Sequence, residues 1–485
     1  MKLKEIIKGI DAELTGAANV EVANLQFDSR HVGRGTLFVA QRGTKVDGHT
    51  FIPQAVAQGA VAVMCEELPS EISPAVVYIK VKDSSEALAL AAANYYGHPS
   101  EKLSLVGITG TNGKTTTVTL LHRMFRQLGF HVGLISTIVN KIDEEELPTG
   151  HTTPDALELN QLLCRMVEAG CRYAFMEVSS HAVVQHRIGG LRFAGGIFSN
   201  ITHDHLDFHK TMANYIAAKQ GFFNMLPKGS WALTNLDDRN GRIMVQNTRA
   251  DVHTYALQCA ADYHCHVLED TFEGMHLELD GSELWCRLVG RFNAYNLTAI
   301  YAAARLCGVD KQEALRQLST LEAAPGRFQY VSGAGVTGIV DYAHTPDALQ
   351  NVITTINDIR RTGQQLITVV GCGGDRDRTK RPEMACIATE GSDKVVLTSD
   401  NPRTEKPEAI LDEMEAGLSA SQLAHVVRIT DRRQAIRTAV MMAREGDIIL
   451  VAGKGHETYQ EVNGVRSHFD DVEELNRMLN EKQTA

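Results

Sequence analysis

Short apolar runs separated by helix-forming segments divide this 485-residue chain into three successive blocks. In the first block the runs at 37–40, 60–64 and 76–81 are apolar, with Ala-rich segments between and after them. This alternation predicts three strands with intervening helices. The polar segment at 97–100 predicts a linker, so we expect a small α/β domain over residues 1–101.

The second block, residues 102–327, opens with an apolar run at 103–108, a glycine-rich loop and a segment of helical periodicity. Continuous apolar runs at 173–178 and 195–201 predict buried parallel strands. An Asp-Gly pair inside 276–288 predicts a hairpin. Because ligands bind at the carboxyl ends of parallel strands, we expect the chemistry of this block at one edge of its sheet.

The third block, residues 328–485, repeats the alternation with runs at 338–343, 365–372, 394–400 and 447–453. This pattern predicts a largely parallel, doubly wound sheet. Each run ends in polar or glycine-rich residues, which indicates a second ligand site. The predicted fold class is α/β in three domains: a small N-terminal α/β domain, a central P-loop ATPase-like parallel-sheet domain and a C-terminal Rossmann-like domain.

Composition narrows the class of protein. Hydrophobic residues make up 44% and charged residues 22%, which is typical of a globular protein. The net charge of −11 argues against a nucleic-acid partner. The acidic N-terminal segment is unlike a signal peptide, and the absence of an 18-residue apolar run argues against membrane insertion. Nine cysteines without a C-x-x-C pair indicate reduced thiols, so we expect a cytoplasmic protein and, further, a monomer.

The segment GITGTNGKTTT at 107–117 is typical of a phosphate-binding loop. Its glycines would let backbone N–H groups surround phosphate oxygens at a helix N-terminus. Lys114 would reach the β- and γ-phosphates, and the Thr115 hydroxyl would hold Mg²⁺. The general pattern has glycine where this chain has Ile108, so the loop is a variant. The alternative is an ordinary strand-to-helix turn with a surface lysine.

Two strand ends beside this loop carry candidate metal ligands. Glu177 ends one apolar run, and a carboxylate there is a natural Mg²⁺ ligand; the alternative is a strand end that faces solvent. The next run leads into His203, His205 and His209 with two aspartates, which a zinc ion could bind. A solvated polar loop is the alternative for the histidines.

Other polar segments are ambiguous by themselves. Lys219 interrupts an apolar helical run, where a lysine ordinarily extends its ammonium to the surface. The segments at 27–30 and 45–49 suit either a ligand's phosphates or ribose, or a turn and a solvated loop. The DNPR segment at 400–403 could be only a proline turn after a strand.

Taken together and in order, these motifs resemble the Mur ligase family of ATP-dependent amide-bond synthetases. The resemblance covers nearly the whole chain, and the Ile108 departure is normal for that family. The shared segments are GTNGKTT (110–116), HTTPD (151–155), EVSSHAVVQHR (177–187), NITHDHLDFH (200–209), YIAAKQ (215–220), GRFNAYN (290–296), APGR (324–327), DYAHTPDAL (341–349), GCGGDRDRTKRP (371–382), DNPR (400–403) and GKGHE (453–457).

The resemblance implies peptidoglycan precursor synthesis with ATP and Mg²⁺ as cofactors. The substrates would be UDP-N-acetylmuramoyl-L-Ala-D-Glu and meso-diaminopimelate, joined through an acyl phosphate. The UDP-linked substrate would bind to residues 1–101, ATP to 102–327 and the amino acid to 328–485.

The resemblance also assigns residues to the nucleotide and the metal. Those matched to ATP are Gly110, Thr111, Asn112, Gly113, Lys114, Thr115, Thr116, Asn296, Arg327, Asp341 and His344. Those matched to the metal are Thr115, Glu177, His205 and Lys219, the last as a carbamate. Those expected to act in catalysis are Lys114, Glu177, His205 and Lys219.

The resemblance assigns the two other substrates as well. Residues matched to the UDP-linked substrate are Phe27, Ser29, Thr44, Lys45, Val46, Thr152, Thr153, Ser179, Gln185 and Arg187. Residues matched to diaminopimelate are Arg376, Asp400, Asn401, Pro402, Arg403, Gly453 and Glu457. Arg403 could bind the distal carboxylate with two parallel hydrogen bonds, and Glu457 could meet the distal ammonium.

Three alternatives stay open at this stage. A lysine-adding member of the family would lack the arginine of DNPR. A folylpolyglutamate synthase would share the phosphate loop without the HTTPD and DNPR segments. A P-loop switch or motor would hydrolyse ATP without these substrates.

Overall fold

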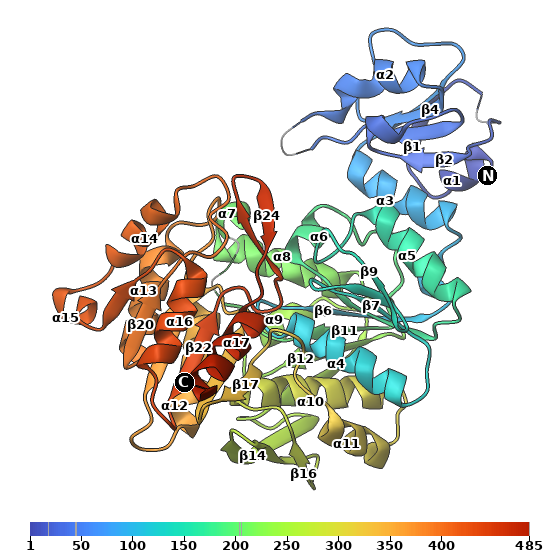
Figure 1. Cartoon of the computed structure of the whole chain (residues 1–485). Coiled ribbons are helices and arrows are strands. Elements are labelled where there is room, and N and C mark those ends of the chain that lie inside the picture. The colour runs from blue at the N-terminus through green and yellow to red at the C-terminus, as the bar shows by residue number, and fades with distance from the viewer. Residues whose placement is uncertain (18, 44–45, 203, 205, 485) are drawn as a thin grey trace.

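The computed structural model describes residues 1–17, 19–43, 46–202, 204 and 206–484. It contains three α/β domains, each built on its own sheet, and a separate two-stranded hairpin (Figure 1). The predicted fold class is therefore confirmed. None of the helices in the described ranges is long and apolar enough to cross a bilayer.

The N-terminal sheet has five strands in the order β1-β5-β4-β3-β2. All neighbours are parallel except β1 and β5. The predicted runs at 37–40, 60–64 and 76–81 correspond to β3, β4 and β5. The elements are α1 (Leu3–Ile6), β1 (Ala12–Thr15), β2 (Asn24–Gln26), β3 (Thr36–Val39), α2 (Ile52–Ala57), β4 (Ala60–Cys65), β5 (Val77–Val81) and α3 (Ser84–Tyr95).

The central sheet has eleven strands in the order β16-β15-β14-β13-β12-β11-β6-β10-β7-β8-β9. Its middle is parallel, whereas both edges are antiparallel extensions. Its strands are β6 (Ser104–Thr109), β7 (Val132–Ile135), β8 (Asn140–Ile142), β9 (Glu145–Leu147), β10 (Tyr173–Glu177), β11 (Gly195–Phe198), β12 (Trp231–Asn235), β13 (Asp251–Ala256), β14 (Tyr263–Thr271), β15 (Gly274–Leu279) and β16 (Ser282–Cys286). Its helices are α4 (Lys114–Gln127), α5 (Ala156–Glu168), α6 (Ser180–Val184), α7 (Leu206–His209), α8 (Met212–Asn224), α9 (Gly241–Val245), α10 (Arg291–Leu306) and α11 (Lys311–Thr320).

Strand β6 lies between β10 and β11, and this order creates the first site. Glu177 pairs in register with Ile108, and Phe198 pairs with Thr109. The carboxyl ends of all three strands therefore meet at one edge. The run predicted at 195–201 ends as a strand at Phe198, and its last three residues turn toward the loop after β6.

The C-terminal sheet has six strands in the order β17-β18-β22-β19-β20-β21, all parallel except β17. The hairpin β23–β24 follows it. The elements are β17 (Gln329–Gly333), β18 (Val336–Asp341), α12 (Pro346–Ile359), β19 (Leu366–Val370), α13 (Lys380–Gly391), β20 (Lys394–Leu397), α14 (Pro407–Glu415), α15 (Ala420–Leu423), β21 (Val426–Arg428), α16 (Arg432–Met442), β22 (Ile448–Ala452), β23 (Tyr459–Val462), β24 (Val465–His468) and α17 (Asp471–Thr484).

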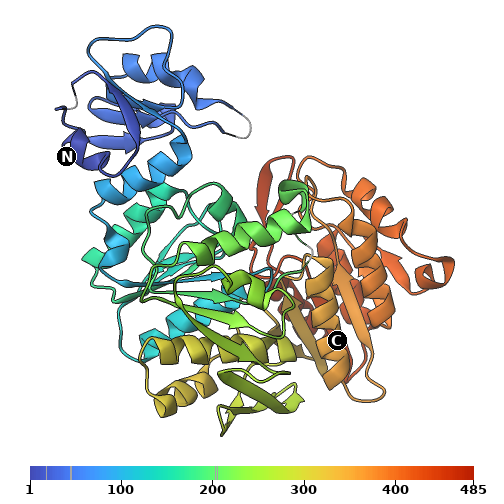
Figure 2. The same cartoon turned by 180° about the vertical axis from the view of Figure 1, so that it is seen from behind.

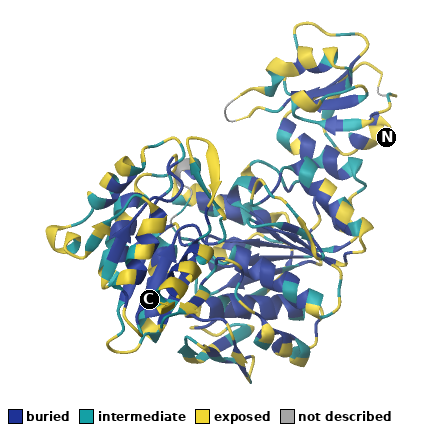
Figure 3. Cartoon of the chain, viewed as in Figure 1, coloured by how far each residue is buried: buried dark blue, intermediate teal, exposed yellow. Residues whose placement is uncertain are grey.

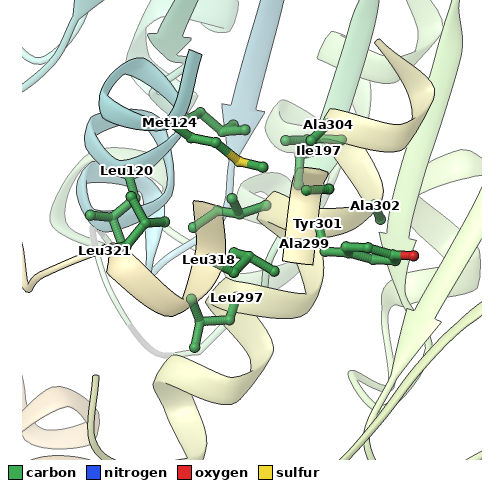
Figure 4. Packing of buried hydrophobic residues seen from close by; sticks show 14 of the residues in the cluster. Leu120, Met124, Ile197, Leu297, Ala299, Tyr301, Ala302, Ala304, Leu318 and Leu321 are labelled. Carbon is green, nitrogen blue, oxygen red and sulfur yellow. The ribbon is translucent and has the colours of Figure 1, made fainter. Parts of the chain in front are cut away.

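The apolar positions predicted for the helix after the phosphate loop form the core. Leu120 and Met124 of α4 are fully buried among Leu297 and Tyr301 of α10 and Leu318 of α11 (Figure 4). Because this packing covers one face of the central sheet, it fixes α4 and hence the loop at its N-terminus. Strands in the middle of each large sheet, such as β4, β6 and β22, are mostly buried, whereas exposed residues lie mainly on outer helices, on loops and on strands such as β1 and β24 (Figure 3).

The N-terminal domain stands apart from the C-terminal domain and adjoins the central one, where α3 packs against α5 (Figure 1). Seen from behind, the central and C-terminal domains lie side by side (Figure 2). This arrangement brings the edges of the second and third sheets to a common cavity.

Candidate functional site

The loop between β6 and α4 has the backbone that a phosphate-binding loop requires. Gly110 and Gly113 have φ of 154° and 86°. A Cβ at Gly110 would lie 1.9 Å from Ser199 Oγ, and one at Gly113 would lie 2.4 Å from Asn296 Oδ1. Thr111 N also donates to the Asn200 carbonyl at 2.8 Å. Both glycines are therefore required by conformation and by space, and the loop is fixed against the end of β11.

Two lysine ammonium groups meet at this loop. Lys114 Nζ donates to the carbonyls of Gly110 and Thr111 at 2.9 and 2.8 Å. Lys219 Nζ donates to the same Gly110 carbonyl at 2.8 Å, and its side chain is only 1% exposed. The interpretation of Lys219 as a surface lysine is therefore wrong, because α8 turns this position toward the end of β6. Burial, and next the charge of Lys114, lower the pKa of Lys219 well below its usual value.

Glu177 lies at the end of β10 and is 1% exposed, so it does not face solvent. Its Oε1 accepts a hydrogen bond from Thr137 N at 2.8 Å. Its buried Oε2 has no hydrogen-bond partner among the described residues. The Thr115 hydroxyl lines the same cavity and accepts from Arg327 Nη2 at 3.2 Å. A carboxylate oxygen without a partner and a hydroxyl are hard oxygen donors, which suit Mg²⁺.

The predicted histidine ligands fall partly outside this description. His203 and His205 are not among the described residues, so the zinc alternative and the assignment of His205 remain untested. His209 contacts Ser180 Oγ at 2.8 Å. Within the described ranges, no group of three or more His, Cys, Asp or Glu side chains could hold a metal. Asp204 lines the cavity beside Lys219.

A cavity of about 410 Å³ joins the phosphate loop to the C-terminal domain. Residues predicted for the site line it from both the central and the C-terminal domain. From the central domain these are Thr111, Asn112, Gly113, Lys114, Thr115, Thr116, Thr152, Glu177, Ser179 and Lys219. The others are Arg327, at the boundary between the two domains, and His344, Arg376, Asp400, Asn401, Arg403, Gly453 and Glu457 of the C-terminal domain. Residues predicted for the nucleotide and residues predicted for the amino acid therefore line the same cavity.

A second cavity of about 350 Å³ continues from the other side of the loop. It contains Asn296 and Asp341, and it shares Asn112, Gly113 and Arg327 with the first cavity. Burial raises the pKa of Asp341 to about 6, although its carboxylate accepts a hydrogen bond from Phe328 N at 2.7 Å. The two cavities together can hold an extended, charged ligand that passes over the phosphate loop.

The segment after β20 lines the part of the first cavity where the residues predicted for the amino acid gather. Arg403 has a φ of 52°, a left-handed conformation that is uncommon outside glycine. Its Nη1 donates to the Gly374 carbonyl at 2.7 Å. Asn401 Nδ2 donates to Glu457 Oε2 at 2.7 Å, which joins this segment to the loop after β22. Pro402 is the one residue of the DNPR segment that does not line the cavity.

The residues predicted for the UDP-linked substrate are not all brought together. Thr153 Oγ1 donates to the Glu177 carbonyl at 2.8 Å, and Arg187 Nη1 donates to the Thr153 carbonyl at 2.7 Å. Arg187 Nε also donates to Gln185 at 3.0 Å, so this group adjoins the cavity edge. Three of the predicted residues lie in the N-terminal domain and do not line the cavity, namely Phe27, Ser29 and the exposed Val46. Thr44 and Lys45 lie outside the described residues.

The sequence reasoning missed Asp347 as a residue of this site. It lies in the first turn of α12, in the C-terminal domain. Its Oδ2 accepts from Asn112 Nδ2 at 2.7 Å and from Thr202 Oγ1 at 3.1 Å. A carboxylate of the third domain therefore contacts the phosphate loop directly. The signal was present in the DYAHTPDAL segment, where an acid follows the proline that opens a helix.

The fold and the site define a P-loop nucleotide-binding protein whose phosphate loop faces a cavity shared with the C-terminal domain. Comparison with known families is consistent with this class. Residues 21–96 match the Mur ligase family catalytic domain, 108–304 match the Mur ligase middle domain, and 326–455 match the Mur ligase glutamate ligase domain. The chain belongs to the Mur ligase family.

Individual relatives extend this result over the full length. A protein of Parabacteroides distasonis named UDP-N-acetylmuramoyl-L-alanyl-D-glutamate--2,6-diaminopimelate ligase is 54% identical over 486 residues, covering 100% of both chains. A solved structure with the same name has a TM-score of 0.71 and 34% identity, covering 99% of this chain and 98% of that one. The MurF ligase of Thermotoga maritima in complex with ADP, at 20% identity, has a TM-score of 0.62 and shares the fold; the match covers 95% of this chain and 98% of that one.

Proposed function

We propose that this protein is an ATP-dependent ligase that adds meso-diaminopimelate to the D-Glu of UDP-N-acetylmuramoyl-L-Ala-D-Glu in peptidoglycan precursor synthesis. The observation that carries the proposal is the single cavity that joins the phosphate loop to Arg403 and Glu457. One ligand site beside Lys114 suits ATP, and the other suits a dicarboxylic amino acid. The full-length relatives carry the same activity in their names.

The residues around the phosphate loop would activate the D-Glu γ-carboxylate. That carboxylate attacks the ATP γ-phosphorus, and the bond between the γ-phosphorus and the oxygen that bridges it to the β-phosphorus breaks. The products of this step are an acyl phosphate and ADP. Lys114 would place its ammonium on the transferring group, because stabilising that charge is the main contribution a protein makes to this step. The loop N–H groups would bind the phosphates that remain with ADP.

Mg²⁺ fits the oxygen donors at this end of the cavity. Thr115, Glu177, His205 and a carbamate on Lys219 would hold it, and it would supply positive charge that neutralises the phosphate oxygens. Lys219 as a free ammonium would repel a cation, whereas as a carbamate it would be an anion. Asn296, Arg327, Asp341 and His344 would surround the rest of the nucleotide.

The second step joins the amino acid to the activated acyl group. The diaminopimelate amine attacks the acyl carbon, a tetrahedral intermediate forms, and phosphate leaves. Arg376, Asp400, Asn401, Arg403, Gly453 and Glu457 would hold diaminopimelate so that its amine faces the phosphate loop. The UDP-linked substrate would reach the same point from the N-terminal domain along Thr152, Thr153, Ser179, Gln185 and Arg187.

This function assigns one substrate to each domain. Residues 1–101 would bind the UDP-linked substrate, 102–327 ATP, and 328–485 the amino acid. The protein would act in the cytoplasm as a monomer without a nucleic-acid partner.

The direct test is phosphate release from ATP and Mg²⁺ with the UDP-linked dipeptide, with meso-diaminopimelate in one reaction and L-lysine in another. Turnover with diaminopimelate alone is the expected result. Turnover with lysine would keep the family and overturn the assigned amino acid. ATP hydrolysis that needs neither substrate would overturn the ligase function.

Replacing Arg403 with alanine is expected to raise the KM for meso-diaminopimelate about 10- to 100-fold. A hydrogen bond to a charged group contributes about 1.5–3 kcal/mol, and this change removes the guanidinium that meets the distal carboxylate. Steady-state phosphate release measures the effect, with Arg437→Ala on the exposed side of α16 as a matched control. An unchanged KM would remove Arg403 from amino-acid recognition.

A further inference from the structure

Lys454 is a fully buried lysine directly beneath the amino-acid end of the cavity. It follows β22 and has an exposed fraction of 0%. Its Nζ donates to Asn401 Oδ1 at 3.0 Å and to Glu457 Oε2 at 3.2 Å. Lys454 does not itself line the cavity, but both of its partners do. It can therefore act on a ligand only through those two side chains.

The Asn401 side chain links three segments around this lysine. Its Oδ1 also accepts from Glu461 N of β23 at 2.9 Å, and its Nδ2 donates to Glu457 at 2.7 Å. The same hairpin supports the neighbouring backbone, because Arg403 N donates to the Glu461 carbonyl at 3.1 Å. The 400–403 segment, the loop after β22 and the β23–β24 hairpin thus meet at one buried ammonium.

Charge explains why a lysine occupies this position. Burial and next the negative charge of Asp400 raise the pKa of Glu457, while Lys454 opposes this shift. Within the described part of the chain, Glu457 also interacts with Arg432, which is paired with Asp471, and with the phenols of Tyr342 and Tyr459. A buried ammonium is costly unless it is paired, and here Glu457 and Asn401, which both line the cavity, supply the pairing.

We propose that Lys454 is a positioning residue for the amino-acid substrate: it fixes Glu457 and Asn401 and keeps an anion facing the substrate ammonium. This role rests on the proposed function, because it requires an amino acid at this end of the cavity. It adds to that function a residue that contacts no substrate but determines how tightly the amino acid binds.

The test is steady-state phosphate release by the full-length chain with Lys454→Met. The KM for meso-diaminopimelate is expected to rise at least tenfold, while the KM values for ATP and the UDP-linked dipeptide change less than twofold. The matched control is Lys482→Met, which removes another lysine of the same domain whose Nζ donates to the carbonyls of Val440 and Ala443. All three KM values should be unchanged in that control.

The second comparison is Lys454→Met/Glu457→Gln against Glu457→Gln. If Lys454 acts through Glu457, the double variant should have a KM for diaminopimelate within threefold of the single variant. This comparison still tests the role of Lys454 if Lys454→Met alone fails to fold. The double variant has no Glu457 carboxylate that would be buried without a partner. In folded Lys454→Met, the acidic limb of the pH profile of the KM for meso-diaminopimelate should move to higher pH than in the wild type, because Lys454 no longer lowers the pKa of Glu457.

The outcomes separate the two proposals. Wild-type protein that does not turn over diaminopimelate would overturn the proposed function. If the wild type does turn over diaminopimelate, three results would overturn only the role of Lys454. The first is an unchanged KM for diaminopimelate in Lys454→Met, and the second is an equal increase in all three KM values. The third is a double variant whose KM for diaminopimelate is ten times that of Glu457→Gln.

Discussion

Lys114→Met is expected to lower kcat for phosphate release about 1,000-fold while the protein stays folded. Lys114 is the cation at the N-terminus of α4, and its Nζ holds the Gly110 and Thr111 carbonyls of the phosphate loop. Removing one preorganised group that stabilises transition-state charge costs about 10²–10³ in kcat. Methionine keeps most of the side-chain volume, and burial already lowers the pKa of Lys114, so losing the charge should not unfold the loop.

The measurement is kcat with all three substrates saturating, together with thermal unfolding of both proteins. Lys228→Met, which changes an exposed lysine of the same domain, is the matched control and should match the wild type. A Lys114→Met protein that retains a tenth of wild-type kcat would show that Lys114 does not contact the transferring group.

The phosphate loop could be predicted from sequence because its determinants are local. Two glycines follow an apolar strand, a lysine and a threonine open the helix after them, and the backbone requires those glycines. The strand runs of the C-terminal domain were predictable for the same reason, since buried parallel strands are short and continuously apolar. The strands β8, β9, β13 and β14 are short or rich in polar residues, so they lack such runs and their ranges were not predicted.

The contacts that complete the site depend on residues distant in sequence. Local pattern favoured a surface position for Lys219, yet the order of strands in the central sheet places it 2.8 Å from the Gly110 carbonyl. Asp347 meets Asn112 across 235 positions of chain and across two domains. The hairpin at β23–β24 supports Arg403 in the same way. No local pattern specifies such pairings, because they arise from topology and packing.

Lys219→Ala is expected to lower kcat about 1,000-fold, by the loss of one preorganised charged group beside the transferring phosphoryl. The structure gives Lys219 the properties that carbamate formation requires. Its amine is buried beside a second lysine, and its pKa lies well below the usual value. The neutral form is therefore accessible. Its nitrogen lone pair would bond to the carbon of CO₂, and one proton would leave to solvent, which yields an anion.

Carbamylation of Lys219 would give a spectroscopic signal that an unmodified lysine would not. Protein equilibrated with ¹³C-bicarbonate should show one slowly exchanging carbonyl resonance that is absent from Lys219→Ala and present in Lys228→Met. A small carboxylate such as acetate should restore part of the activity of Lys219→Ala, because alanine leaves space where an anion can bind near Thr115 and Glu177. If the wild type shows no such resonance and acetate restores nothing, Lys219 acts as an ammonium, and the charge around Glu177 must be balanced by that cation instead.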